Sequence, residues 1–418
     1  MNALRLTPLA FSLFALSLHS HAAEDFSNLL SQGKASLDAR YRYEYVDQDN
    51  LLNNANAQTL RTRLGFQSGK FHGLSALVEA DNVSRIGDAA YNSTRNGQSQ
   101  YSVVADPDGT EMNQALLRYD HTLGNLIGGR QRINLDNQRF IGSVAWRQNE
   151  QTFDGALGQL KPIENLTLTY AYIDNINSVF GPDNGRYASA ANPANIEGHS
   201  HLFNAQYQVA TELVITGYSY LLGLNNLALI ASGPTGTQSS KTSGVRLTGL
   251  VQGFSYAAEY ASQTDYADNP WSLDSDYYLG ELGYTLQTVA LKAGYEVLTG
   301  DSGPGARNQA FQTPLATKHA FQGWADVFLT TPIGGVEDAY LGASMPLLGG
   351  TAQAVYHDFS AQSSVSTDDD YGSEINLSYA HPIPGVKGLV GLAKYADYSA
   401  DDFSVDTRKF WLQLQYSL

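Results

Sequence analysis

The fold can be read first in the stretch Lys409-Phe410-Trp411-Leu412-Gln413-Leu414-Gln415-Tyr416-Ser417-Leu418. Apolar side chains occupy every second position from Phe410 to Leu418, and the positions between them are polar apart from Trp411. Successive side chains of an extended strand point to opposite faces, so this stretch predicts a strand with one apolar and one polar face. Because a strand with an open edge is prone to aggregate, we expect a neighbour on each side of it. We therefore hypothesise a closed β-barrel with lipid outside and water inside.

Composition excludes several other classes of protein. The chain has 418 residues, with 25 Lys and Arg against 41 Asp and Glu, and this net charge of -16 argues against a nucleic-acid partner. Beyond the N-terminus, no apolar run approaches the roughly 18 residues that a membrane helix needs. The absence of cysteine excludes a disulfide framework and thiolate chemistry. A membrane barrel remains possible, because its strands are only half apolar.

The first residues predict an export signal. Arg5 supplies a positive charge, 9–18 is a short apolar core, and Ser20-His21-Ala22 offers a cleavage site. A buried N-terminal helix is the alternative. We expect a signal peptide over 1–22 and a single outer-membrane β-barrel domain over 23–418.

The same alternation recurs along the whole chain. In 36–45, for example, Leu37, Ala39 and Tyr41 are separated by polar residues. About eighteen such segments can be placed, an even number as in bacterial barrels. They lie near 36–45, 60–67, 74–81, 110–121, 125–134, 150–160, 166–175, 199–210, 212–222, 239–249, 253–264, 275–286, 288–298, 335–345, 350–360, 370–381, 388–398 and 407–418.

The connections alternate between long and short, which is typical of outer-membrane barrels with long extracellular loops and short periplasmic turns. The short turns centre on Gly69, Gly124, Pro162, Thr211, Gly249, Gln287, Pro346 and Pro384. Proline cannot donate to a strand ladder, and none of the 13 prolines interrupts a predicted strand. A soluble β-sandwich would also alternate, but it would not give this asymmetry of loops.

Several motifs resemble the alginate-export family of outer-membrane barrels and related gammaproteobacterial porins. These motifs are Gly129-Arg130-Gln131-Arg132-Ile133, Asp136-Asn137-Gln138-Arg139-Phe140-Ile141-Gly142, Trp146-Arg147-Gln148-Asn149, Gly294-Tyr295-Glu296-Val297-Leu298-Thr299-Gly300-Asp301, Phe311-Gln312-Thr313-Pro314-Leu315 and Ala393-Lys394-Tyr395-Ala396-Asp397-Tyr398. The resemblance spans about 35–418 and implies an 18-stranded monomeric channel. Alginate export itself is a narrower reading, since many chains with this pattern are general porins.

Basic side chains on the polar faces of the strands are the candidates for lining the pore. With two acidic partners they are Arg40, Arg42, Arg61, Arg63, Arg118, Arg130, Arg132, Arg246, Lys292, Lys394, Glu79 and Glu296. Arginine binds planar carboxylates through paired hydrogen bonds, so rings of it favour anionic solutes. The alternative is that these arginines pair with lumen carboxylates and simply brace the wall.

The connection 299–334 is unusually long and apolar. Phe311, Phe321 and Trp324 need burial, so we expect this loop to fold inward as a constriction or lid. Packing against the outer rim is the alternative.

Catalysis is not expected. No G-x-S-x-G or H-E-x-x-H motif occurs, and only His357-Asp358 lies where a barrel enzyme would carry catalytic groups. We expect no cofactor and no metal, although acidic loops could bind divalent cations that bridge lipopolysaccharide.

The sequence thus predicts an all-β outer-membrane channel for small hydrophilic, anionic solutes such as organic acids, uronates or acidic oligosaccharides. Its expected partners are outer-membrane lipid and lipopolysaccharide, the barrel-assembly machinery and the solutes, with no nucleic acid. Two alternatives stay open. One is a dedicated exporter of an anionic exopolysaccharide such as alginate, and the other is a secreted soluble β-rich polysaccharide-binding protein.

Overall fold

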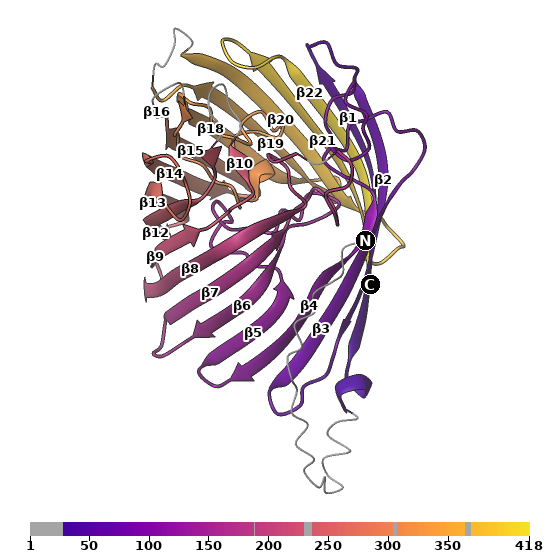
Figure 1. Cartoon of the computed structure of the whole chain (residues 1–418), viewed down its shortest axis with the longest axis vertical. Helices are drawn as coiled ribbons and strands as arrows, with labels where there is room; N and C mark the ends of the chain where they lie inside the picture. The colour runs from indigo at the N-terminus through magenta and orange to yellow at the C-terminus, as the bar shows by residue number, and fades with distance from the viewer. Residues whose placement is uncertain (1–27, 188, 230–235, 304–306, 364–368) are drawn as a thin grey trace, which may run out of the picture.

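A computed structural model describes residues 28–187, 189–229, 236–303, 307–363 and 369–418, so the expected signal peptide lies outside the described residues. The chain forms a closed antiparallel sheet of 18 strands, which confirms the predicted all-β barrel (Figure 1). The strands are β1 (Lys34–Gln48), β2 (Ala55–Gln67), β3 (Leu74–Arg85), β4 (Gly109–His121), β5 (Gly124–Gln131), β6 (Thr152–Leu160), β7 (Leu166–Asn177), β8 (Asn195–Ala210), β9 (Leu213–Leu222), β12 (Ser240–Val251), β13 (Phe254–Asp265), β14 (Asp274–Leu286), β15 (Val289–Thr299), β18 (Gly335–Leu347), β19 (Gly350–Ser360), β20 (Asp370–Pro382), β21 (Leu389–Ala400) and β22 (Thr407–Ser417).

The first and last strands close the barrel. β1 pairs with β22 in antiparallel register, with Arg40 opposite Gln415 and Tyr43 opposite Leu412. β1 also pairs with β2, so these three strands lie side by side (Figure 1). The register places residues that face the lumen opposite one another, such as Arg42 and Gln413, and does the same for outward residues such as Tyr41 and Leu414. A slip of one residue would turn the apolar face of β22 inward.

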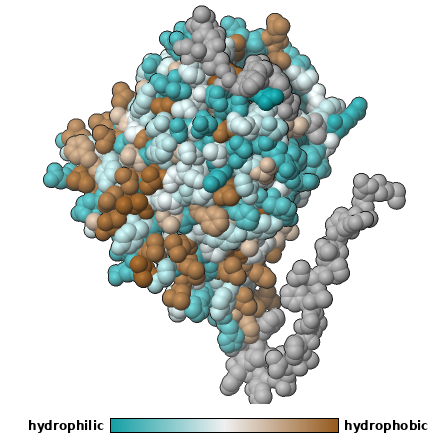
Figure 2. Space-filling view, turned by 60° about the vertical axis from the view of Figure 1, so that its left-hand side comes forward, coloured by the Kyte–Doolittle hydropathy of each residue, from teal (hydrophilic) through white to brown (hydrophobic). Residues whose placement is uncertain are grey.

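The outward faces of the strands are apolar. Leu341 on β18 is 64% exposed and Leu282 on β14 is 60% exposed, although a soluble β-protein would bury strand leucines of this kind in its core. Figure 2 shows such side chains gathered in patches along one side of the wall. A barrel in lipid has this apolar exterior and a polar interior. No helix in the described part of the chain is long and apolar enough to cross a bilayer.

Short turns join the strands at one end of the barrel and long loops at the other. The long loops also carry the two-residue strands β10 (Ala228–Leu229), β11 (Gly236–Thr237), β16 (Ser302–Gly303) and β17 (Arg307–Asn308), and the 3-10 turn η1 (Lys318–Ala320). β5 and β6 are shorter than the predicted 125–134 and 150–160. They stop early because the chain between them leaves the wall and enters the lumen.

The core lies inside the barrel. Its largest buried cluster joins inward-facing strand residues such as Tyr277 and Trp411 to loop residues such as Phe140, Phe311 and Phe328. Loops of the chain therefore fill part of the lumen of this 18-stranded barrel, and the candidate functional site lies where they contact the wall.

Candidate functional site: an ion-paired lumen crossed by two loops

Most of the sequence-predicted basic residues face the lumen. On β2, Leu64 is 59% exposed to the outside, whereas the guanidinium-bearing side chain of its neighbour Arg63 is only 11% exposed. The same alternation turns inward the candidates on the strands, which are Arg40, Arg42, Arg61, Arg63, Glu79, Arg118, Arg246, Lys292, Glu296 and Lys394.

Arg130 is the exception, because it faces outward. It pairs across β5 and β6 with Asp154, on the same face as the exposed Leu126 and Leu160. Its guanidinium contacts the Asp154 carboxylate at 2.7 and 3.0 Å and donates to the Met112 carbonyl oxygen. The expectation that Arg130 lines the pore is therefore wrong, and the reason is register: β5 is too short to show its alternation in sequence.

Two loops meet inside the lumen. We call 132–151 the first inner loop and 309–331 the second inner loop. The Gly142 N–H donates to the Leu315 carbonyl at 2.9 Å, and the Thr317 N–H donates to the Gln138 carbonyl at 3.0 Å. The two loops therefore pack as one unit.

Burial of the second inner loop was predicted from its apolar residues, whereas no inward fold was predicted for the first, which lies between the predicted strands 125–134 and 150–160. Phe311 is fully buried against Phe140, with ring centroids 6.0 Å apart. The signal for the first inner loop was present in its apolar residues Phe140, Ile141 and Trp146, which a solvated loop would not carry.

Arg139 ties the first inner loop to the wall and to the second inner loop. Its guanidinium donates to Glu296 on β15 at 2.7 Å, to Thr313 at 3.0 Å and to Gln322 at 3.0 Å. The Phe321 ring lies 4.7 Å from the guanidinium carbon. Burial opposes the charge of Arg139, but the Glu296 carboxylate outweighs it and raises the pKa of Arg139. Each buried donor is thus paired, as a buried charge requires.

A second set of ion pairs centres on Asp326. Its carboxylate lies 2.9 Å from the Lys409 ammonium on β22 and 3.4 Å from Arg147 of the first inner loop. Arg147 also contacts Glu44 on β1 at 3.0 Å. Burial by itself would raise the pKa of Asp326, yet its neighbours His319, Lys409 and Arg147 hold it well below the usual value. These pairs fix both inner loops to the strands that close the barrel.

Lys394 occupies an aromatic cage. Its ammonium lies 3.6 Å from the Trp324 ring centre, 4.4 Å from Trp146 and 5.6 Å from Trp411. The ammonium also lies 2.6 Å from His319 Nε2, and His319 Nδ1 lies 2.7 Å from Asp326. Burial lowers the pKa of His319 to about 3, so the ring is neutral, donates through Nδ1 to Asp326 and accepts from Lys394.

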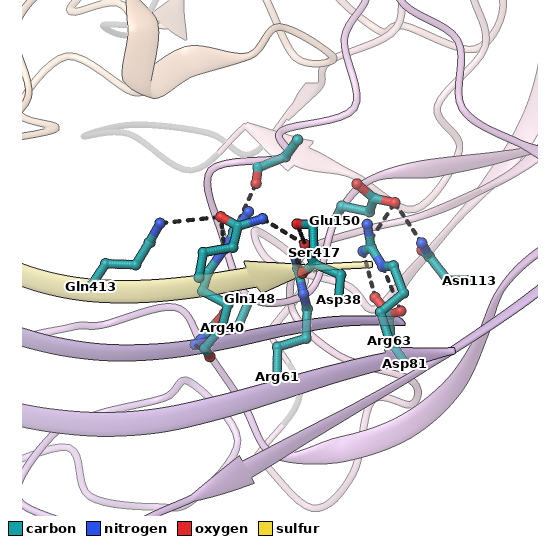
Figure 3. Close-up of polar contacts among 12 residues, drawn as sticks. Asp38, Arg40, Arg61, Arg63, Asp81, Asn113, Gln148, Glu150, Gln413 and Ser417 are labelled. Carbon is teal, nitrogen blue, oxygen red and sulfur yellow. Dashed lines mark hydrogen bonds and ion pairs between the residues drawn. The ribbon is translucent and has the colours of Figure 1, made fainter. Parts of the chain in front are cut away.

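Arg40 on β1 lies close to Arg61 and Arg63 on β2 (Figure 3). Arg42 shares the inward face of β1, so these four arginines form a row on the lumen side of the two strands. Arg63 makes a bidentate pair with Asp81 at 2.7 and 2.6 Å and reaches Glu150 at 3.1 Å. Arg61 pairs with Asp38. The bracing alternative therefore describes much of this row, because these guanidinium groups are already held by carboxylates.

Arg40 and Arg42 differ from the rest of the row because they bind the first inner loop. Arg40 donates to the Ala145 carbonyl at 3.0 Å, and Arg42 donates to the Trp146 carbonyl at 2.6 Å. Arg40 makes no ion pair with any carboxylate among the residues that the structure describes. Its positive charge therefore acts on the lumen with less compensation than that of Arg63.

The remaining predicted residues are paired within the lumen. Arg132 contacts Glu79 at 2.5 Å, Arg246 pairs with Glu259, Lys292 pairs with Glu281 at 2.9 Å and Arg118 with Asp120 at 2.8 Å.

The enzyme alternative finds no support in the geometry. His357 faces inward and contacts Asp338 at 2.9 Å, while Asp358 is exposed on the opposite face of β19. The two residues are neighbours in sequence but not a pair in space. Within the described ranges, no group of three or more His, Asp or Glu side chains is arranged to hold a metal ion.

Comparison with known proteins agrees with this architecture. The family model for alginate export matches residues 31–328, well over half of the chain. No curated protein matches the chain.

Solved barrels from Pseudomonas aeruginosa are similar in fold. OccK3 is 15% identical with a TM-score of 0.68, covering 96% of this chain and 99% of its own. OccK9 is 16% identical with a TM-score of 0.70, covering 94% and 99%. OpdK, solved with vanillate, is 14% identical with a TM-score of 0.67, covering 93% and 99%.

Proposed function

The chain belongs to the alginate export family of outer-membrane β-barrels, and from this premise we propose that it conducts small hydrophilic anions across the outer membrane. The solutes would be organic acids, uronates or short acidic oligosaccharides. The long loops would face the cell exterior and the short turns the periplasm, as in bacterial barrels.

The observation that carries the proposal is the row of lumen arginines. Arg40, Arg42, Arg61 and Arg63 stand on adjacent strands, and Arg40 forms no ion pair with a carboxylate among the described residues. Arginine guanidinium groups suit carboxylates in both charge and shape. A solute carboxylate can exchange with the loop carbonyl that now accepts from Arg40. OpdK, a similar barrel, was solved with vanillate, itself a small carboxylate.

The inner loops bear on the size of the solute. They cross the lumen from the wall at Tyr218 and Tyr277, which contact Phe140, to the wall at Trp411, which contacts Trp146. We infer that they form the constriction of the channel. Export of a long polysaccharide, the other candidate that the family suggests, would require both loops to move together.

Charge selectivity tests the proposal. The reversal potential of the purified protein in planar bilayers is measured under a salt gradient, because it reports the ratio of anion to cation permeability. Anion preference is expected, and it should fall when Arg40 is changed to Gln. Cation selectivity in the wild type would overturn the proposal.

A matched control uses an arginine that is held by carboxylates. Arg63→Gln combined with Asp81→Asn removes one charge of each sign from a compensated pair and leaves the net charge of the lumen unchanged. The selectivity of this double variant should stay close to that of the wild type, whereas Arg40→Gln should lower anion preference. A block of anion current by short uronate oligomers, but not by long polymers, would separate a solute channel from a polysaccharide exporter.

A further inference from the structure

A hollow of ≈ 840 Å³ lies on the outer face of the wall, across β4 to β9 and toward the short turns. Nearly all of the exposed surface that lines it is apolar. The hollow is therefore continuous with the lipid-facing wall, and the proposed conduction of anions through the lumen makes no use of it.

Small residues form the floor of the hollow. Ala205 on β8 lies opposite Gly217 on β9, and Gly158 on β6 lines the same hollow. A Cβ added at Gly217 would meet no atom within 4 Å, so nothing in the chain covers this part of the floor. Larger side chains project around it, and the exposed rings of Tyr170 and Phe203 lie 5.0 Å apart. The wall therefore dips beside a ridge of aromatic side chains.

Two polar side chains stand at the short-turn rim of the hollow, on either side of Leu123. The Leu123 N–H donates to His121 Nδ1 at 3.3 Å, and the Leu123 carbonyl accepts from the Lys161 N–H at 2.7 Å. Because Nδ1 accepts this bond, the neutral His121 ring carries its proton on Nε2 and can donate to an outside acceptor. The Lys161 side chain is exposed and forms no ion pair among the residues that the structure describes, not even with Glu164 of the same turn. The rim therefore offers a positive charge and a further donor.

We propose that this hollow binds one phospholipid, with an acyl chain over the small-residue floor and the phosphate at Lys161 and His121. With the short turns in the periplasm, this end of the wall lies in the periplasmic leaflet, which in outer membranes is formed by phospholipid. Lipid chains are as apolar as the wall, so the gain comes from close packing in the hollow and from the charged contact at its rim.

The shape of the hollow favours a lipid over a second copy of the chain. The wall of another barrel is convex, so it would rest on Tyr170 and Phe203 without reaching Gly217. A stable protein interface needs about 1,000 Å² or more of closely packed surface, which such a contact would not supply. A flexible acyl chain can lie along the floor, and the volume of the hollow falls within the range of about 300–1,000 Å³ typical of sites for one small molecule.

Native mass spectrometry of the purified full-length protein tests the proposal, because it counts the lipids that stay bound after the detergent is removed. The two probes are phosphatidylglycerol and a diacylglycerol with the same acyl chains, which differ only in the headgroup. The wild type should retain one phosphatidylglycerol at concentrations severalfold below those needed for the diacylglycerol. Equal retention of the two lipids would overturn the proposal.

Variants of the floor locate the binding. Gly217→Leu fills the hollow and should weaken retention of phosphatidylglycerol roughly tenfold, because it keeps about two methylene groups of the chain out of the floor. Ala205→Leu fills the same floor from β8 and should act alike. The matched control is Gly280→Leu on β14, another outward glycine whose added Cβ meets open space, and it should retain lipid like the wild type.

A variant of the rim tests the headgroup contact. Lys161→Met should lower retention of phosphatidylglycerol to the level of the diacylglycerol and leave retention of the diacylglycerol unchanged. Lys387→Met, at the exposed turn between β20 and β21, is its control and should behave like the wild type. Unchanged lipid retention in both floor variants would contradict the proposal. So would a wild-type dimer that Gly217→Leu converts to a monomer, since the occupant would then be a second copy.

Discussion

Acidification should loosen the inner loops through His319. The ring is buried and neutral, with its pKa lowered to about 3 from the usual 6.5 because of burial and the nearby positive charges. If the second inner loop leaves its place, the ring returns to water and its pKa returns to the usual value. Between these two pKa values, His319 is protonated in the loosened state and neutral in the packed state.

The sign and size of the effect follow from this difference. A depressed pKa means that the contribution to stability is complete above 6.5 and is lost progressively as the pH falls toward 3. Each pH unit in that window favours the loosened state by about 1.4 kcal/mol, or about tenfold. At about pH 5 the packed state has lost about 2 kcal/mol, roughly a thirtyfold change in the equilibrium. Asp326 does not offset this, because its own pKa lies well below the usual value.

Single-channel recording measures the effect. The fraction of time spent at high conductance should rise steadily as the pH is lowered from neutral to about 5. His319→Gln keeps one donor and one acceptor but cannot take up a proton in this range, so its profile should be flat. A pH dependence in His319→Gln equal to that of the wild type would refute the reasoning, as would a wild-type profile that does not change.

Three further predictions concern the loops and the wall. Asp326→Asn removes the buried carboxylate that pairs with Lys409 and Arg147, which should destabilise the packed inner loops by about 3–5 kcal/mol and raise the noise of the channel current. The control Asp268→Asn, on an exposed loop, should leave the current noise unchanged. Deleting 303–330 should raise single-channel conductance, and an unchanged value would contradict the constriction. On β18, Leu341→Arg places a charge in lipid and should destabilise the barrel by about 2–4 kcal/mol in urea titration, while Ser344→Arg on the lumen face should cost much less.

Local alternation was sufficient to predict the wall. The strands repeat the two-residue period over most of their length, and the prolines that the described strands include, Pro346 and Pro382, stand at the turn ends of β18 and β20. The number of strands and the facing of Arg61 or Arg63 could therefore be read without distant contacts. The same argument failed at Arg130, because the eight residues of β5 include three glycines that carry no facing information.

The interior could not be predicted in the same way. Arg139 meets Glu296 although 157 residues separate them, and no local pattern encodes that pairing. Lys394 was predicted from the sequence as a pore-lining base, but its aromatic cage was not. The cage is formed by Trp146, Trp324 and Trp411, which come from three separate segments of the chain.

The contacts of the first inner loop with β1 and β22 have a consequence for how the molecule reaches its folded state. Arg147 forms an ion pair with Glu44 on β1, and Trp146 packs against Trp411 on β22. These contacts span most of the sequence, and native contacts of such separation slow folding because a large loop must be closed before they form. Once the first inner loop lies inside the lumen, however, it offers a preformed packing surface to both β1 and β22. Zippering of the seam and filling of the interior therefore become one cooperative step, and an assembly intermediate should be trapped with its first and last strands still apart when Trp146 is removed.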